Sequence, residues 1–260
     1  RADVLANSTH GPPGDAHVAG LDGLALAVEP GGAWYIPLTH RAPDGDLLNN
    51  TAPLNLPPLT DPAMAGLKEL LEDPKVPKAG HNLKRNWLRL RTAGVELGGV
   101  SYDSMVASFL LDPGKRSHAL SALGVEHLGL RVPPYQEVVG KGKGKRLFAE
   151  IALDEAGQYA GQYCAATLAL RDYFAPQLES TGLGRLLEEI EMPLIAVLVE
   201  MEWKGITLDS ERLAGLSSES RLSRIINGYE TPREAEVEAI CGVLNHTPDD
   251  LGFQTKGTHS

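Results

Sequence analysis

The sequence predicts an α/β fold in which a β-sheet and helices form layers, followed by a helical C-terminal segment. Three observations support this prediction. Two β-like runs surround a turn signal within residues 21–38, and strand and helix patterns alternate from residue 76 to about residue 103. Beyond residue 113 most of the chain has helical periodicity.

The first elements follow from local signals. In "LDGLALAVEPGGAWYIPL" the two runs flank Glu29-Pro30-Gly31-Gly32, a strong turn signal, which predicts an antiparallel hairpin. A loop rich in Pro, Asn and Asp follows. The stretch "DPAMAGLKELLEDP" then predicts a helix, because Asp61 is a good cap, Pro62 suits the first helical position and Pro74 ends the pattern.

The next elements alternate in type. A short strand near residues 76–80 leads into "NLKRNWLRLRTAG", a predicted helix that ends at Gly94. Leu83, Trp87 and Leu90 share one stripe of this helix and are expected to face the sheet, with Asn86 at its edge. Further helices are predicted over three ranges, residues 117–129, 151–176 and 183–203.

Composition excludes several function classes. The chain has 260 residues, 42% of them hydrophobic, and a net charge of −10, which disfavours a surface that binds nucleic acid everywhere. No apolar run reaches membrane-spanning length, and the N-terminus lacks the apolar core of a signal peptide. Cys164 and Cys241 form no zinc or disulfide pattern. We therefore expect a cytoplasmic protein.

Several stretches carry a family resemblance. The segments "AGHNLKRNWLRLRTAGVEL", "VSYDSMVASFLLDP", "IALDEAGQYAGQYCAATLAL" and "EIEMPLIAVLVEMEWKGITLD" occur in this order along the chain. They resemble the 3′→5′ proofreading exonuclease domain of bacterial DNA polymerase I, family A, with the opening of the polymerase thumb. The resemblance implies a ribonuclease H-like fold, with a mixed sheet of about five strands flanked by helices.

The resemblance also predicts the domain organisation. Residues 1–176 are expected to form the exonuclease-like domain, and residues 177–216 the start of a thumb-like helical segment. Residues 217–260 resemble part of a Cro/repressor-type helix-turn-helix, although the usual first helix is lacking.

In the family, four carboxylates hold two Mg²⁺ or Mn²⁺ ions that carry out the hydrolysis. An Asp-x-Glu pair lies in the first strand, a further Asp lies in the helix after "NLK", and the last Asp follows a Tyr by four residues. The corresponding positions here are Ser8, His10, Asn86 and Tyr163, and Tyr159 matches the family tyrosine. We therefore predict a degenerate active site that binds no metal, although Mg²⁺ or Mn²⁺ is expected for the family.

The favoured function is that of a catalytically inactive domain with a structural or DNA-positioning role in replication or repair. Two other functions stay open. A weak metal-dependent 3′→5′ exonuclease could use substitute ligands such as His10, Asp15 or Asp103. A DNA-binding regulator could act through the C-terminal tail.

The basic residues allow two interpretations. Lys84, Arg85, Arg89 and Arg91 are expected to point away from the sheet, and a solvated face is the favoured interpretation. The alternative is a strip that contacts DNA phosphates, made of Asn82, Lys84, Arg85, Lys141, Lys143 and Lys145. The expected partners are single-stranded or primer-template DNA, bound weakly, and a polymerase module. Because DNA is an expected partner, we also expect the protein to associate with the bacterial nucleoid.

Overall fold

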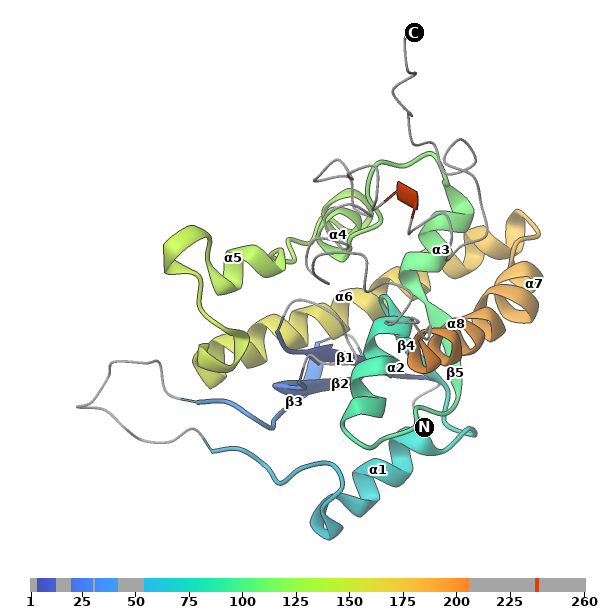
Figure 1. Cartoon of the computed structure of the whole chain (residues 1–260). Helices are drawn as coiled ribbons and strands as arrows, with labels where there is room; N and C mark the ends of the chain where they lie inside the picture. Colours follow the sequence, from blue (N-terminus) through green and yellow to red (C-terminus); the bar gives the residue numbers. More distant parts are fainter. Residues whose placement is uncertain (1–3, 13–19, 30, 42–53, 206–236, 239–260) are drawn as a thin grey trace, which may run out of the picture. The chain divides into compact units, whose positions relative to one another are not determined.

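The computed structural model describes residues 4–12, 20–29, 31–41, 54–205 and 237–238. The chain divides into two compact units, residues 1–204 and 205–260. All the helices and strands named below belong to the first unit (Figure 1). Most of the tail expected to resemble a helix-turn-helix, and residues 206–216 of the thumb-like segment, lie outside the described residues.

A single mixed sheet forms the centre of the first unit. Its strands are β1 (Leu5–His10), β2 (Gly23–Glu29), β3 (Gly32–Pro37), β4 (Lys78–Gly80) and β5 (Val100–Asp103), in the spatial order β3-β2-β1-β4-β5. β1 pairs with β2 and β2 pairs with β3 in antiparallel fashion, whereas β1–β4 and β4–β5 are parallel. The predicted hairpin and the five-stranded mixed sheet are thus confirmed.

One glycine of the hairpin is required by a close approach. A Cβ atom on Gly23 would lie 2.0 Å from the hydroxyl oxygen of Tyr35, which comes from the neighbouring strand. The Tyr35 hydroxyl in turn donates a hydrogen bond of 2.6 Å to Nε2 of His40. The missing side chain at Gly23 therefore leaves the space in which this tyrosine reaches His40.

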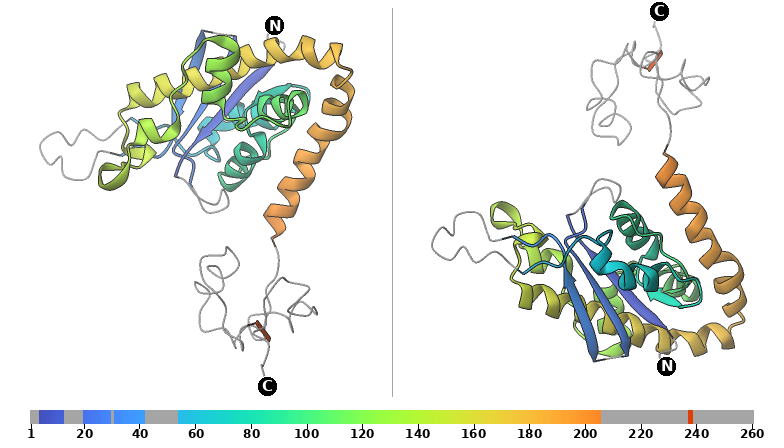
Figure 2. Two further views of the ribbon diagram at one scale, coloured as in Figure 1. Left: turned by 90° about the horizontal axis from the view of Figure 1, so that it is seen from above. Right: turned by 90° about the horizontal axis from the view of Figure 1, so that it is seen from below.

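The two faces of β1 are covered by different helices. The long helix α6 (Leu153–Ser180) packs across β1, β2 and β3 (Figure 2), and α2 (Leu83–Thr92) packs against β1 and β4. Because side chains alternate along a strand, His10 reaches the rings of α6 whereas Thr9 reaches Asn86 of α2. The end of β1 therefore presents polar side chains toward both helices.

The remaining helices complete the layers. They are η1 (Pro62–Met64), α1 (Ala65–Glu72), α3 (Ser104–Leu111), α4 (Leu120–Leu128), α5 (Tyr135–Val139), η2 (Gly142–Gly144), η3 (Phe148–Glu150), α7 (Gly184–Leu186), η4 (Leu187–Glu191) and α8 (Met192–Lys204). The Asp61 side chain caps the first of them, as predicted, by accepting a hydrogen bond from the backbone of Ala63. None of the helices within the described ranges combines the length and apolar character needed to cross a membrane.

Two predicted helices differ from the structure, one at its end and one in its interior. The helix expected over residues 151–176 continues through Pro176 to Ser180, so the expected domain boundary at residue 176 falls inside α6. The helix expected over residues 183–203 is interrupted by the π-helical segment η4. Pro193 follows this segment, and its ring would crowd the carbonyl four residues earlier in a regular α-helix, which favours the wider π turn there.

Candidate functional site

A pocket of about 260 Å³ lies where β1 and β4 end, between α2, α5 and α6. It brings together all five positions that the sequence assigned to the degenerate site. Ser8 and His10 come from β1, Asn86 comes from α2, and Tyr159 and Tyr163 come from α6. Ser8 and His10 of the first strand thus share a pocket with the other three positions, and residues 1–3 and 13–19 beside them lie outside the described ranges.

His10 is enclosed by aromatic rings. Its ring stacks on Phe148 with centroids 5.2 Å apart and meets Tyr159 and Tyr163 edge to face at 5.4 and 5.9 Å. Its Nε2 is hydrogen-bonded to Ser8 Oγ at 3.1 Å. Burial lowers the pKa of His10 to about 3, so the imidazole is neutral at physiological pH.

The two tyrosines occupy the α6 side of the pocket as neutral phenols. Burial raises the pKa of Tyr159 to about 12 and also raises the pKa of Tyr163. The two rings meet edge to face at 6.1 Å, and Tyr163 also contacts His81 at 6.0 Å. Aromatic contacts thus fill the place where the family resemblance expects a carboxylate.

Asn86 links the helix to the strand. Its Oδ1 accepts a hydrogen bond of 2.9 Å from Thr9 Oγ1. Its buried Nδ2 has no hydrogen-bond partner among the described residues. The amide therefore keeps a donor unsatisfied at the wall of the pocket.

Arg89 corrects the prediction of a solvated basic face. Only 5% of it is exposed, and it donates to the backbone carbonyls of Thr9, Gly11 and Pro12 at 3.1, 3.3 and 2.7 Å. It lies three residues after Asn86 and so shares that residue's side of α2. This spacing was the signal that could have placed Arg89 in the pocket.

The predicted phosphate strip is divided in the structure. Asn82 and Arg85 line the pocket, and Arg85 is exposed. Lys84 instead forms an ion pair with Glu202 of α8. Lys141 and Lys145 are exposed in the loop around η2 and do not line the pocket, and the side chain of Lys143 lies outside the description.

Arg91 also faces α8 rather than solvent. Its guanidinium pairs with Glu200 at 2.5 Å and lies 4.8 Å from the ring centre of Trp203. Two of the four basic residues on α2, Lys84 and Arg91, are therefore engaged by side chains of α8.

Asp103 has a structural role. It is 1% exposed and accepts hydrogen bonds from the backbone N–H groups of Asn82, Leu83 and Met105 at 3.1, 2.6 and 2.8 Å. Burial raises the pKa of this carboxyl group, and the N–H donors oppose that shift. Both oxygens are occupied at the starts of α2 and α3, and Asp103 does not line the pocket, so it is a poor candidate for a substitute ligand. Asp15 lies outside the described residues.

The side chains that line the pocket do not provide the ligands that a pair of divalent cations needs. Among the residues that the structure describes, no aspartate or glutamate lines it, and two arginines do. Across the described parts of the chain, no group of three His, Cys, Asp or Glu side chains is placed to hold a metal ion. Mg²⁺ and Mn²⁺ prefer anionic oxygen ligands, which this pocket does not supply.

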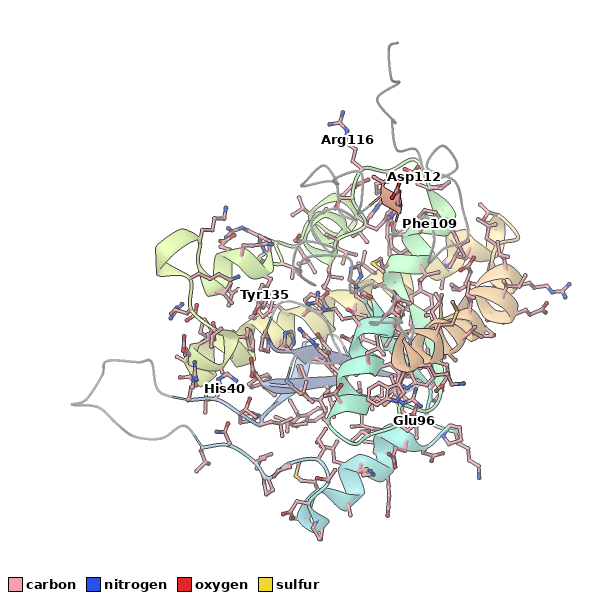
Figure 3. All side chains as sticks on the ribbon, viewed as in Figure 1. His40, Glu96, Phe109, Asp112, Arg116 and Tyr135 are labelled. Carbon is pink, nitrogen blue, oxygen red and sulfur yellow. The ribbon has the colours of Figure 1, made fainter. Side chains whose placement is uncertain are left out.

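Sequence reasoning missed two further wall residues. Tyr135, which Figure 3 labels, and Gln136 of α5 line the pocket. The Tyr135 hydroxyl donates to the carbonyl of Gly11 at 3.1 Å. No local pattern indicates that this short helix after Pro133-Pro134 returns to β1. His81 of the lining is buried and bonded to Ser104 Oγ at 2.9 Å.

Comparison with known proteins points to one family for part of the chain. Residues 56–157 match the family model for the DNA polymerase I, ribonuclease H-like domain. DNA polymerase I of Rhizobium leguminosarum is 38% identical over 214 residues, which cover 79% of this chain and 21% of that protein. The chain thus spans about a fifth of the length of this relative.

Two solved structures have similar folds. The Pol1 POL domain of M. smegmatis, in complex with DNA primer-template and dNTP, is 25% identical with a TM-score of 0.61 over 95% of this chain and 36% of that one. Brucella melitensis NrnC bound to pGG has a TM-score of 0.59 at 17% identity, over 80% of this chain and 90% of that one, and shows the fold alone. From the family match and these relatives, residues 56–157 are identified as a ribonuclease H-like domain of the DNA polymerase I family.

Proposed function

We propose that the first unit is a catalytically silent, proofreading-exonuclease-like domain. Its role is to position single-stranded or primer-template DNA, or to brace a polymerase module, during DNA replication or repair at the bacterial nucleoid. The observation that carries this proposal is the pocket at the end of β1, which has no carboxylate at residues 8, 10, 86 and 163.

Electrostatics supports the loss of catalysis. Two-metal hydrolysis requires anionic ligands that hold two dications about 3.5–4 Å apart, where they stabilise the attacking and leaving oxygens. Here the candidate ligands at the same place are a hydroxyl, a neutral imidazole, an amide and a neutral phenol. The guanidinium groups of Arg85 and Arg89 repel a cation that enters the pocket.

Charge also supports weak DNA binding. The chain carries a net charge of −10, and Lys84 and Arg91 are paired with acids of α8. Each phosphate contact made by a free Lys or Arg contributes affinity by releasing counterions, so few free cations imply weak binding with a shallow dependence on salt. Of the predicted phosphate strip, Arg85, Lys141 and Lys145 are exposed cations available for such contacts.

A nuclease assay tests the proposal. Labelled single-stranded DNA is incubated with the protein in EDTA, Mg²⁺ or Mn²⁺, and we expect no release of nucleotides under any of these conditions. Metal-dependent release from the 3′ end by the wild-type protein, abolished by EDTA, would overturn the proposal and favour the weak exonuclease.

A restoration variant provides the matched comparison. The combined changes Ser8→Asp, His10→Glu, Asn86→Asp and Tyr163→Asp return four carboxylates to the pocket. We expect this variant to bind Mn²⁺ in calorimetric titration where the wild-type protein does not. Equal Mn²⁺ binding by the two proteins would show that the four positions do not decide metal affinity. Circular dichroism establishes beforehand that the variant is folded.

A further inference from the structure

The charge balance of the pocket is the reverse of that of a cation site. Two guanidinium groups, those of Arg85 and Arg89, line it, and no carboxylate of residues 4–12, 20–29, 31–41 or 54–205 does. Neither arginine forms an ion pair with a carboxylate of the described residues. The two histidines of the lining, His10 and His81, are kept neutral by burial.

Arg89 is a buried cation that no carboxylate contacts within the described ranges of the chain. Burial lowers its pKa to about 10, so the guanidinium is still charged at neutral pH. It is held by three neutral carbonyl groups, and the nearby Asp22 attracts it without forming an ion pair. Burying a charge that is not neutralised costs free energy, which an anion beside it would reduce.

Unsatisfied donors lie at the same wall. Asn86 Nδ2 and Arg89 Nε are both buried and have no hydrogen-bond partner among the described residues. Asn86 and Arg89 are 6% and 5% exposed, respectively. The phenols of Tyr159 and Tyr163 remain protonated and add two O–H donors to the lining. The described lining therefore offers several hydrogen-bond donors and no negative charge.

The start of α2 does not supply these donors. The N–H groups of Asn82 and Leu83 are already bonded to the Asp103 carboxylate. Recognition of an anion in the pocket must therefore depend on side chains, with Arg85 as the exposed cation at its entrance.

From this arrangement we propose that the pocket is a metal-independent anion site for a phosphate monoester, the group found on a nucleoside monophosphate or at a phosphorylated DNA end. At about 260 Å³ it has room for roughly eight water molecules of about 30 Å³ each, so a phosphate with part of an attached sugar fits. Guanidinium groups bind phosphate oxygens by charge-assisted hydrogen bonds. The inference concerns the same pocket as the proposed function but does not require that function to be correct.

Binding in EDTA tests this inference. The full chain is titrated by calorimetry with inorganic phosphate, thymidine 5′-monophosphate and uncharged thymidine. We expect both phosphate compounds to bind, thymidine not to bind, and affinity to fall as salt increases. Oligothymidylates with a 3′-phosphate, a 5′-phosphate or neither then distinguish a free nucleotide from a strand end as the source of the group.

Two charge-neutralising variants locate the site. Arg85→Gln removes the exposed cation of the lining and is expected to weaken phosphate binding about tenfold. Arg116→Gln makes the same change of charge on the exposed connection between α3 and α4, outside the lining (Figure 3), and is expected to leave affinity unchanged. Asn86→Asp places a carboxylate at the wall and is expected to abolish binding.

The outcomes separate the two proposals. Absence of phosphate binding by the wild-type protein in EDTA, equal weakening by Arg85→Gln and Arg116→Gln, or a requirement for Mn²⁺ would overturn the anion site. The nuclease result decides only whether the domain is silent. A domain that neither cleaves DNA nor binds phosphate would support the proposed function and overturn the anion site. A domain that cleaves DNA and also binds phosphate in EDTA would do the reverse.

Discussion

His10 makes the stability of the domain depend on pH in a way that can be calculated. Its pKa falls from an ordinary value of 6.5 to about 3 in the folded protein, chiefly because burial disfavours the charged ring. As pH falls below about 6.5, the unfolded chain binds a proton that the folded chain does not, so the free energy of unfolding falls until the pH approaches 3. The stabilisation by the neutral ring is therefore complete above pH 6.5.

The expected magnitude follows from the same shift. One pH unit in this window is worth about 1.4 kcal/mol, so lowering the pH from 7 to 5 costs about 2 kcal/mol through His10. His10→Gln removes this proton linkage. Its loss of unfolding free energy between pH 7 and pH 5 should be about 2 kcal/mol smaller than that of the wild-type protein. If the free energy of unfolding falls by about 3 kcal/mol per molar urea, the urea midpoint of His10→Gln should shift between the two pH values by roughly 0.7 M less than that of the wild-type protein.

Urea denaturation followed by circular dichroism at pH 7 and pH 5 measures both shifts. Leu71→Ala serves as the control, because it removes a fully buried aliphatic side chain in α1 without changing a titratable group. It should lower stability at both pH values and keep the wild-type pH dependence. An equal loss from pH 7 to pH 5 in His10→Gln and wild type would refute the argument that a buried neutral imidazole carries the effect.

Three further predictions concern the frame of the site. Asp103→Ala leaves buried backbone N–H groups without an acceptor at the starts of two helices. It should lower the free energy of unfolding, measured by urea denaturation, by about 3 kcal/mol or more. A loss below about 1 kcal/mol would contradict the capping role of Asp103. Gly23→Ala forces a methyl group against Tyr35, so it should cost about 1–3 kcal/mol in the same assay, and an unchanged midpoint would show that the strand has free space there. Burial raises the pKa of Cys164 to about 12. In a Cys241→Ser background, the Cys164 thiol should therefore react with a disulfide reagent only after the protein unfolds. Rapid labelling of the native protein would count against the burial of Cys164.

Local chemistry was enough for much of the fold. The turn at Glu29-Pro30-Gly31-Gly32 gave the hairpin, and the Asp61 cap with Pro62 located the start of the first helical region. Strong turn and cap signals act within a few residues, which is why sequence alone predicts them. The ends of the later helices were predicted less well, because a proline inside α6 and the π turn before Pro193 are tolerated through packing.

The sequence by itself determined the chemical character of the candidate site. The residues at positions 8, 10, 86 and 163 carry no negative charge at neutral pH, whatever their surroundings, and this property needs no coordinates. The resemblance placed them in one site, and the structure brings them into one pocket.

Only the tertiary structure decided where the positive charges of α2 lie. Arg89 turns inward onto the carbonyls that follow β1, Lys84 pairs with Glu202 of α8, and Arg85 stays exposed at the pocket. Helical periodicity assigns a side chain to a face, but the partner of that face can lie far along the chain, as Glu202 lies 118 residues from Lys84. A long arginine or lysine finds its acceptor only when those segments have packed against the helix.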